Sequence, residues 1–311
     1  MYLSYFVIAP TVIRVTVAAP VADEYKSRFI NRGFYLQQPF KHLHMNKIFL
    51  ILLVLVIASC TKEEFSPNLT KEFSILSTSN GATYDIQVAL PQNYNSETQS
   101  YAVIYLLDGE ENFDFVAENC SKISRGLATD NVLVVGIGYG NDREMDYTPS
   151  KGGGGPVKGG GGAEKFMLFI KDELIPKIES DYRADASREN RTILGHSFGG
   201  LLTTYAFTNH NNVFGNYIIL SPSLWYDDEI MFKLEQENRN LNQNNPQLVF
   251  MGLGELENSG QMLAPFQAFF MRLQNNYPDM VIKSHLEPHL NHRGSQNPNI
   301  IEGLNFYFQN R

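Results

Sequence analysis

The chain has 311 residues, of which 43% are hydrophobic and 19% are charged, a composition that excludes disordered and fibrous classes of protein. A net charge of −8, with the lysines and arginines scattered along the chain, argues against a nucleic-acid partner. The two cysteines, Cys60 and Cys120, lack the spacing of a zinc site or a redox pair, so the sequence implies no metal and no cofactor.

The N-terminal part of the chain contains a segment typical of an exported lipoprotein. Met45–Lys47 is a short basic start, residues 48–58 are apolar, and small residues then lead to Cys60. This pattern resembles a bacterial lipoprotein signal peptide over residues 45–59, in which Cys60 is lipidated and becomes the mature N-terminus. The apolar run is shorter than the roughly 20 residues that a permanent transmembrane helix needs. We expect a membrane-anchored protein of the cell envelope with a polar tether over residues 60–71; a buried helix with a chance cysteine is the alternative.

Residues 1–44 fit poorly with this interpretation, because a signal sequence is recognised at the beginning of a chain. We expect Met45 to be the true start and residues 1–44 to have no folded role. Peptides from residues 1–44 in mature protein from the native host would contradict this expectation.

From residue 72 to the C-terminus, the pattern predicts one α/β domain. Glu72–Ser77 and Thr83–Leu90 alternate in polarity across the turn residues Ser79–Gly81, which favours an antiparallel hairpin at the edge of a sheet. Apolar strands that alternate with helices then predict a mostly parallel sheet with helices on both faces. The expected strands are Tyr101–Leu107, Val132–Ile137, Thr192–Leu194, Tyr217–Leu220, Leu248–Met251 and Val281–His285. The expected helices are Phe113–Arg125, Ala163–Tyr182, Phe198–Asn209, Glu229–Gln236, Gln261–Asn276 and Asn299–Gln309.

The second of these helices carries a clear apolar stripe. Phe166, Ile170, Leu174 and Ile178 recur every four residues and should face the sheet. Pro176 should kink this helix or start a new segment, because proline lacks a backbone N–H.

A long connection from Tyr139 to Gly162 contains two tetraglycine runs, Gly152–Gly155 and Gly159–Gly162. Such runs do not hold a fixed backbone without a large entropic cost. We expect a mobile flap beside the functional site, and a tolerated surface insertion is the alternative.

The most informative motif is Gly195–Gly200, whose sequence GHSFGG follows a strand pattern and precedes a helix pattern. A serine in such a turn adopts a strained backbone conformation that exposes its hydroxyl, and glycines two positions before and after it relieve crowding. Ser197 is therefore the candidate nucleophile, and the backbone N–H of Phe198 is a candidate oxyanion donor. A second donor is expected from Gly109 or Glu110, in the turn after strand Tyr101–Leu107, where the glycine would allow close approach of substrate.

The orienting acid is expected on the loop after strand Leu248–Met251. Glu257 lies far enough past the strand to turn back towards a histidine, and Glu255 is the alternative. The catalytic base is expected on the loop after the last strand, where His292 and His289 compete. Small polar residues around His292 favour it, and the order Ser197, Glu257, His292 is the one expected of this fold.

The other histidines have simpler interpretations: His42 and His44 fall in the N-terminal extension, His196 points away from the Ser197 hydroxyl, His210 closes a helix and His285 packs within a strand. Three further residues are candidates for substrate contact. Trp225 and Tyr226 could wall the acyl or aryl site, and Arg143 could attract an anionic substrate; a half-buried aromatic pair and a solvated arginine are the alternatives.

Several motifs together resemble the esterase family of α/β-hydrolases that includes esterase D, feruloyl and acetyl xylan esterases and ferric enterobactin esterase-like siderophore hydrolases. The resemblance runs from about Phe73 to the C-terminus and is carried by Tyr105–Gly109, Arg143 with Asp146–Pro149, Glu173–Pro176, Gly195–Gly200 and Ser221–Trp225. Asp146–Pro149 and Ser221–Trp225 are most similar to the siderophore-esterase branch.

This resemblance implies an α/β-hydrolase fold and a serine esterase that acts through Ser197, His292 and an acid on the loop of Glu257. It supports His292 over His289 by the gap to Gly303 and Leu304. It implies a siderophore lactone as substrate, with a hydroxycinnamoyl or acetyl ester on plant polysaccharide and a thioester as alternatives. An inactive hydrolase fold that serves as a binding lipoprotein is a further alternative, although an intact set of Ser, His and acid argues against it.

Overall fold

The structure is a computed structural model, and it describes residues 69–311 apart from residues 93, 95–98, 131, 141, 153–158, 246 and 258–260. The expected signal peptide, the lipidation at Cys60 and the extension over residues 1–44 lie outside the described residues. In the described part of the chain, no helix combines the length and apolar character needed to cross a membrane.

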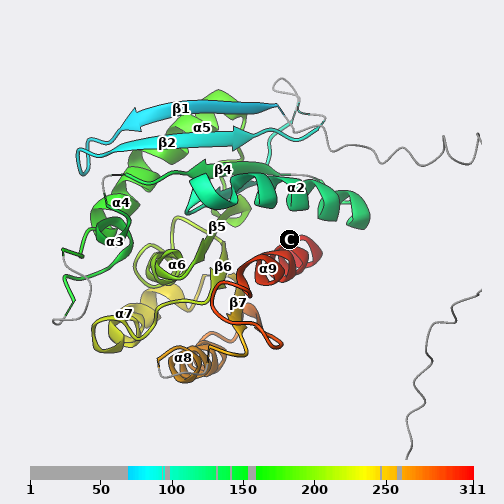
Figure 1. The fold of residues 1–311 in the computed structure, drawn as a ribbon. Helices are drawn as coiled ribbons and strands as arrows, with labels where there is room; N and C mark the ends of the chain where they lie inside the picture. The colour runs from blue at the N-terminus through cyan, green and yellow to red at the C-terminus, as the bar shows by residue number, and fades with distance from the viewer. Residues whose placement is uncertain are drawn as a thin grey trace, which may run out of the picture. The chain divides into compact units, whose positions relative to one another are not determined.

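One sheet of eight strands forms the centre of the domain (Figure 1). Its order is β1-β2-β4-β3-β5-β6-β7-β8. β2 pairs antiparallel with both β1 and β4, and every other neighbouring pair in this order, from β4 and β3 to β7 and β8, is parallel. The strands are β1 (Thr70–Leu76), β2 (Thr83–Ala89), β3 (Val103–Leu106), β4 (Leu133–Ile137), β5 (Arg191–His196), β6 (Asn216–Leu220), β7 (Leu248–Gly254) and β8 (Val281–Glu287). The predicted fold class and edge hairpin are confirmed, and β1 begins two residues before the expected boundary at residue 72.

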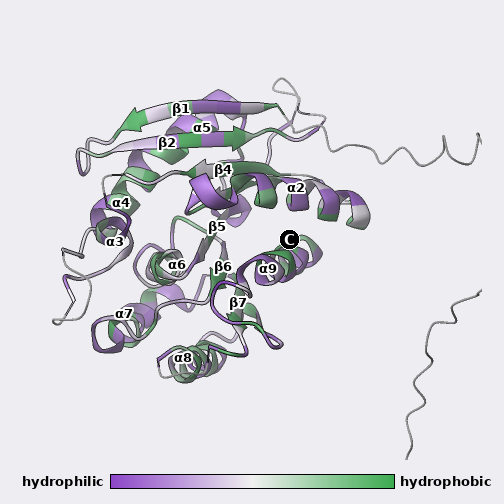
Figure 2. Ribbon diagram, viewed as in Figure 1, coloured by the Kyte–Doolittle hydropathy of each residue, from purple (hydrophilic) through white to green (hydrophobic). Residues whose placement is uncertain are grey.

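Burial explains which strands alternate in polarity and which do not. Every residue of β3, β4 and β6 is buried, as expected of parallel strands covered on both faces. The edge strand β1 is mostly exposed, and β2 alternates between exposed and buried residues. In Figure 2, β1 carries both hydrophilic and hydrophobic colours along its length, in agreement with the mixed polarity of its sequence.

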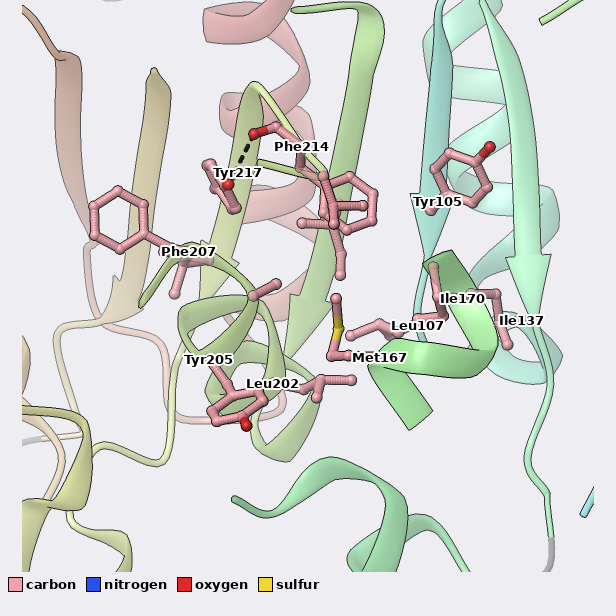
Figure 3. Close-up of a cluster of buried hydrophobic side chains, with 14 of the residues drawn as sticks. Tyr105, Leu107, Ile137, Met167, Ile170, Leu202, Tyr205, Phe207, Phe214 and Tyr217 are labelled. Carbon is pink, nitrogen blue, oxygen red and sulfur yellow. Dashed lines mark hydrogen bonds between the residues drawn. The ribbon is translucent and has the colours of Figure 1, made fainter. Parts of the chain in front are cut away.

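Helices cover both faces of the sheet (Figure 1). The longer helices are α2 (Gly109–Leu127), α4 (Ala163–Phe169), α5 (Ile175–Tyr182), α6 (Phe198–Asn209), α7 (Tyr226–Asn242), α8 (Leu263–Asn276) and α9 (Gln296–Asn310). One hydrophobic core lies beneath α2 and α9, and a larger one lies beneath α4 to α8. Figure 3 shows part of the larger core, where the Tyr217 hydroxyl donates a hydrogen bond of 2.8 Å to the carbonyl of Phe214.

The expected helix over residues 163–182 is divided at the place that Pro176 predicts. A π-helical segment, η1 (Ile170–Leu174), connects α4 to α5, and Pro176 is the second residue of α5. The wider π turn removes the need for the N–H that proline lacks. The stripe of Phe166, Ile170, Leu174 and Ile178 is fully buried as predicted.

Two local differences from the expected elements bear on the site. A short helix, α3 (Arg143–Tyr147), interrupts the long connection before the glycine runs, and its N-cap Asp142 accepts hydrogen bonds from the N–H groups of Glu144 and Met145. Helix α7 spans Tyr226–Asn242, but Asp227 to Glu229 have positive φ, so a kink precedes the regular helix, which follows the expected start at Glu229. Tertiary contacts rather than local propensity support this unusual turn.

Candidate active site

Ser197 occupies a strained turn between β5 and α6. Its φ of 61° and ψ of −119° lie outside the regions that non-glycine residues ordinarily adopt. A Cβ on Gly195 would collide with the backbone of Gly199, and a Cβ on Gly199 would lie 3.1 Å from the Asp108 carboxylate. The glycines therefore provide the room that the motif predicts, and the surrounding backbone holds the half-buried Ser197 in this strained conformation.

The hydroxyl of Ser197 reaches a histidine from the other end of the domain. It donates to Nε2 of His292 over 3.0 Å, and Nδ1 of His292 donates to Oε2 of Glu257 over 2.6 Å. Ser197 follows β5, Glu257 follows β7 and His292 follows β8, so the three side chains meet at the carboxyl edge of the sheet. This hydrogen-bonded chain has the connectivity of a nucleophile, a base and an orienting acid.

The carboxylate of Glu257 is held from several sides. Its Oε1 accepts hydrogen bonds from the hydroxyls of Ser221 and Ser295, at 2.7 and 3.1 Å, and from the N–H of Gly254 at 2.7 Å. Burial raises the pKa of this carboxyl, but the hydrogen bonds from His292, Gly254 and Ser221 outweigh burial, so its pKa falls below the ordinary value. Glu257 is therefore ionised beside His292 near neutral pH.

Glu255 and His289, the alternative acid and the alternative base, contact each other and not Ser197. The Glu255 side chain is 51% exposed and its carboxylate lies 3.4 Å from Nδ1 of His289, whose side chain is 90% exposed. Glu257, in contrast, has a side chain that is 2% exposed. The loop after β7 thus turns one glutamate inward and the other into solvent.

Two helix N-termini lie close together near Ser197, the candidate nucleophile. Phe198 is the first residue of α6, and Gly109 and Glu110 are the first two residues of α2. The first N–H groups of a helix have no acceptor within it, and they favour negative charge. The carboxylate of Asp108, which precedes α2, lies close to Gly199 of α6, so the two N-termini are neighbours. These N–H groups remain the predicted oxyanion donors.

Packing against the sheet explains the need for a glycine at position 109, and this explanation differs from the expected one. A Cβ at this position would lie 2.8 Å from the backbone of Gly136 and Ile137 in β4. The glycine therefore allows α2 to begin against the sheet, whereas the sequence analysis attributed it to the approach of substrate.

An open cleft of about 380 Å³ lies over the Ser197 hydroxyl. Its lining residues in the described part of the chain are Ser197, Phe198, Ser223, Trp225, Leu256, Glu257, Met262, Asn291 and His292. Trp225 lies in this wall, as expected of a substrate contact. The apolar residues of this lining are Phe198, Trp225, Leu256 and Met262.

Arg143 and Tyr226 are placed differently from Trp225. The guanidinium of Arg143 forms a bidentate ion pair with Asp108, at 2.6 and 2.8 Å. Its positive charge is therefore paired with a buried carboxylate. Tyr226 is buried behind the cleft wall, in edge contact with the Phe198 ring, and its hydroxyl donates to the carbonyl of Ser150 over 2.8 Å. Neither belongs to the described lining of the cleft, so their predicted contact with substrate has no support in this geometry.

The described ends of the glycine-rich connection are tied to the start of α7. The Ser150 hydroxyl donates to Asp227 over 2.5 Å, and a Cβ on Gly160 would lie 2.7 Å from the Tyr226 hydroxyl. Ser150, just before the first glycine run, and Gly160, within the second, therefore both lie beside the segment that follows Trp225. Residues 153–158, within the expected flap, lie outside the described residues, and its mobility stays a prediction.

Sequence reasoning missed the residues that hold the acid. Ser221 and Ser295 both donate to Glu257. From the sequence alone, Ser221 was included only within the motif Ser221–Trp225, and Ser295 was counted only among the small polar residues around His292. Nothing local marks either serine as a partner of a glutamate on another loop. Within the described residues, no cluster of three or more His, Cys, Asp or Glu side chains is gathered to hold a metal ion.

Comparisons with known proteins agree with this architecture. The family model described as "Putative esterase" matches residues 77–285, a span that includes Ser197 and Glu257 and ends before His292. The ferri-bacillibactin esterase BesA of Bacillus subtilis is 32% identical over 194 residues, which are 56% of this chain and 66% of that protein. The matches cover about half to two thirds of the length of BesA and of other curated siderophore esterases.

Solved structures resemble the whole domain. The BES protein from Bacillus cereus has a TM-score of 0.69 and 28% identity, over 79% of this chain and 97% of that chain. An IroE-like serine hydrolase from Shewanella oneidensis has a TM-score of 0.68 and 26% identity, over 77% of this chain and 80% of that chain. With the family model matched over most of the domain, the chain belongs to the esterase family of α/β-hydrolases.

Proposed function

We propose that this chain is a serine hydrolase of carboxylic esters and that its substrates are siderophores. The observation that carries the proposal is the hydrogen-bonded chain from Ser197 through His292 to Glu257 at the floor of an open cleft. This arrangement can generate a nucleophile, and the strained turn directs it towards the cleft.

In the proposed reaction, Nε2 of His292 takes the proton of Ser197 as Oγ attacks the ester carbonyl. Glu257 stabilises the imidazolium that forms, and the N–H groups of Phe198 and of Gly109 or Glu110 bind the oxyanion. The imidazolium then protonates the leaving alcohol oxygen, and an acyl-enzyme remains. Water attacks this acyl-enzyme with His292 as base, and the carboxylic acid is released as the serine hydroxyl is restored.

The substrate class rests on the relative and on the shape of the cleft. BesA is a ferri-bacillibactin esterase, and the described lining of this cleft combines Trp225 and Phe198 with Leu256 and Met262. An open cleft with an aromatic wall suits an aryl-bearing ester that is too bulky for a narrow pocket.

A substrate panel tests this proposal. We expect ferri-bacillibactin or an enterobactin-type lactone to be hydrolysed with a higher kcat/KM than methyl ferulate or acetylated xylan. A preference for the feruloyl or acetyl ester would replace siderophores by plant polysaccharide as the substrate. Failure of a fluorophosphonate probe to label the protein would instead favour a binding lipoprotein without hydrolase activity.

We further propose that the protein is anchored in the bacterial cell envelope through a lipid on Cys60. The support is the sequence pattern of residues 45–60. In the native host, the wild-type protein should incorporate labelled palmitate and fractionate with membranes, and Cys60→Ser should do neither. A Cys120→Ser variant is the matched control, because this cysteine is buried in α2.

A further inference from the structure

His196 lies beside both Ser197 and His292. It is the last residue of β5 and directly precedes Ser197. Its side chain is buried, and its Nε2 lies 3.0 Å from the main-chain carbonyl oxygen of His292. The two imidazole rings are 4.6 Å apart between centroids. His196 therefore binds the backbone carbonyl of His292, and the Nε2 atom of His292 remains available to Ser197.

The chemistry of this contact assigns the proton on His196. A carbonyl oxygen only accepts hydrogen bonds, so Nε2 of His196 carries the hydrogen and donates it. Burial, together with the neighbouring His292, lowers the pKa of His196 to about 4, although Glu257 partly opposes this shift. His196 is therefore neutral near pH 7 and adds no positive charge next to the imidazolium that would form on His292.

The contact connects two separate loops. The carbonyl of His292 has one further described partner, the Ser295 hydroxyl at 3.5 Å, which is at the limit of a hydrogen bond. The bond from His196 is shorter and comes from the turn that carries the nucleophile. The side chains of two consecutive residues, His196 and Ser197, thus contact His292 at its carbonyl oxygen and at its Nε2.

We infer that His196 is a positioning residue, which fixes the distance between Ser197 and His292 by donating a hydrogen bond to the main chain of His292. This inference rests on the proposed hydrolase function. Without the bond, the loop after β8 keeps its other contacts but gains freedom at the base. A misplacement of about 1 Å can reduce a rate by about 10²-fold.

Two substitutions separate the hydrogen bond from the space that the ring fills. His196→Leu fills similar space without a donor, whereas His196→Gln retains an N–H at a comparable reach. With a short p-nitrophenyl ester as substrate and the full chain as enzyme, His196→Leu should reduce kcat by about 10- to 100-fold with little change in KM. His196→Gln should recover most of this loss.

His210→Leu is the matched control. His210 has the same residue exposure as His196, 9%, but its Nε2 bonds to Glu164 on α4, and neither of these two residues is in the described lining of the cleft. The His210→Leu variant should lower the melting temperature by about as much as His196→Leu does, and it should leave kcat within about twofold of wild type. If His196→Leu does not fold, His196→Asn takes its place in the comparison. The asparagine amide is one methylene too short to reach the carbonyl of His292.

The outcomes separate this inference from the proposed function. A wild-type protein that does not hydrolyse the ester, or a Ser197→Ala variant that still does, would overturn the hydrolase proposal itself. With an active wild type, an unchanged kcat in His196→Leu would overturn the positioning role. Equal losses in the glutamine variant and in the leucine or asparagine variant would overturn it as well, because the donor would then make no difference.

Discussion

The hydroxyl of Ser197 lies 3.0 Å from Nε2 of His292, although 95 positions separate the two residues along the chain. The sheet brings them together, because β5 and β8 run parallel and both loops leave its carboxyl edge. This geometry supports the proposal that the two side chains act as one unit, so their joint removal is informative.

Ser197→Ala and His292→Ala should each reduce hydrolysis of a short p-nitrophenyl ester by about 10³-fold or more. The double variant should be about as slow as either single variant, because each substitution removes the same step. Ser124→Ala, at a buried serine of α2 remote from the cleft, should retain full activity. Additive losses in the double variant would contradict a shared step.

Glu257→Gln should reduce kcat by at least about tenfold, because it removes the charge that stabilises the imidazolium of His292. Glu255→Gln should change kcat by less than about twofold, since this residue pairs with exposed His289. Steady-state kinetics of both variants test the assignment. The reverse order of effects would move the acid to Glu255.

Gly109→Ala should lower the free energy of unfolding by about 1–3 kcal/mol, because the new Cβ meets the backbone of β4. It should also lower kcat, since α2 must shift and carry its first N–H groups with it. Gly126→Ala is a control on the same helix, where a Cβ meets nothing within 4 Å. That variant should be unchanged or more stable by up to about 1 kcal/mol. Urea unfolding and kinetics of both variants distinguish these effects.

Asp146 should make stability depend on pH. Burial raises its pKa to about 6, although the hydrogen bond from Tyr84 opposes the shift and Asp142 adds to it. Because the folded pKa exceeds the unfolded one, the stabilising contribution is complete below about pH 4 and is lost as pH rises through about 6. Asp146→Asn should therefore be more stable than wild type at pH 8. Urea unfolding should show this advantage shrinking towards pH 4, and a constant difference would contradict the assignment.

Much of the fold could be predicted because its signals are local. Continuous apolar runs predicted the inner strands, and alternating polarity predicted the hairpin of β1 and β2. Pro176 predicted the break between α4 and α5. The short helix α3 was missed although Asp142 caps it locally, because five residues are too few to show a helical period. The left-handed start of α7 was missed because no local residue preference marks it, and the Ser150 hydroxyl contacts it from a distant segment.

The same distinction between local signals and tertiary contacts applies to the candidate site. The sequence by itself determined the parallel sheet and the strained turn at Ser197, because hydrophobic periodicity and the steric needs of glycine act within a few residues. It also limited the acid and the base to two candidates each. Only the tertiary structure decided that Glu257 faces inward, that Arg143 pairs with Asp108 and that His196 holds the carbonyl of His292. These contacts join loops from different strands, and the direction of a side chain on such a loop depends on the packing of the whole domain around it.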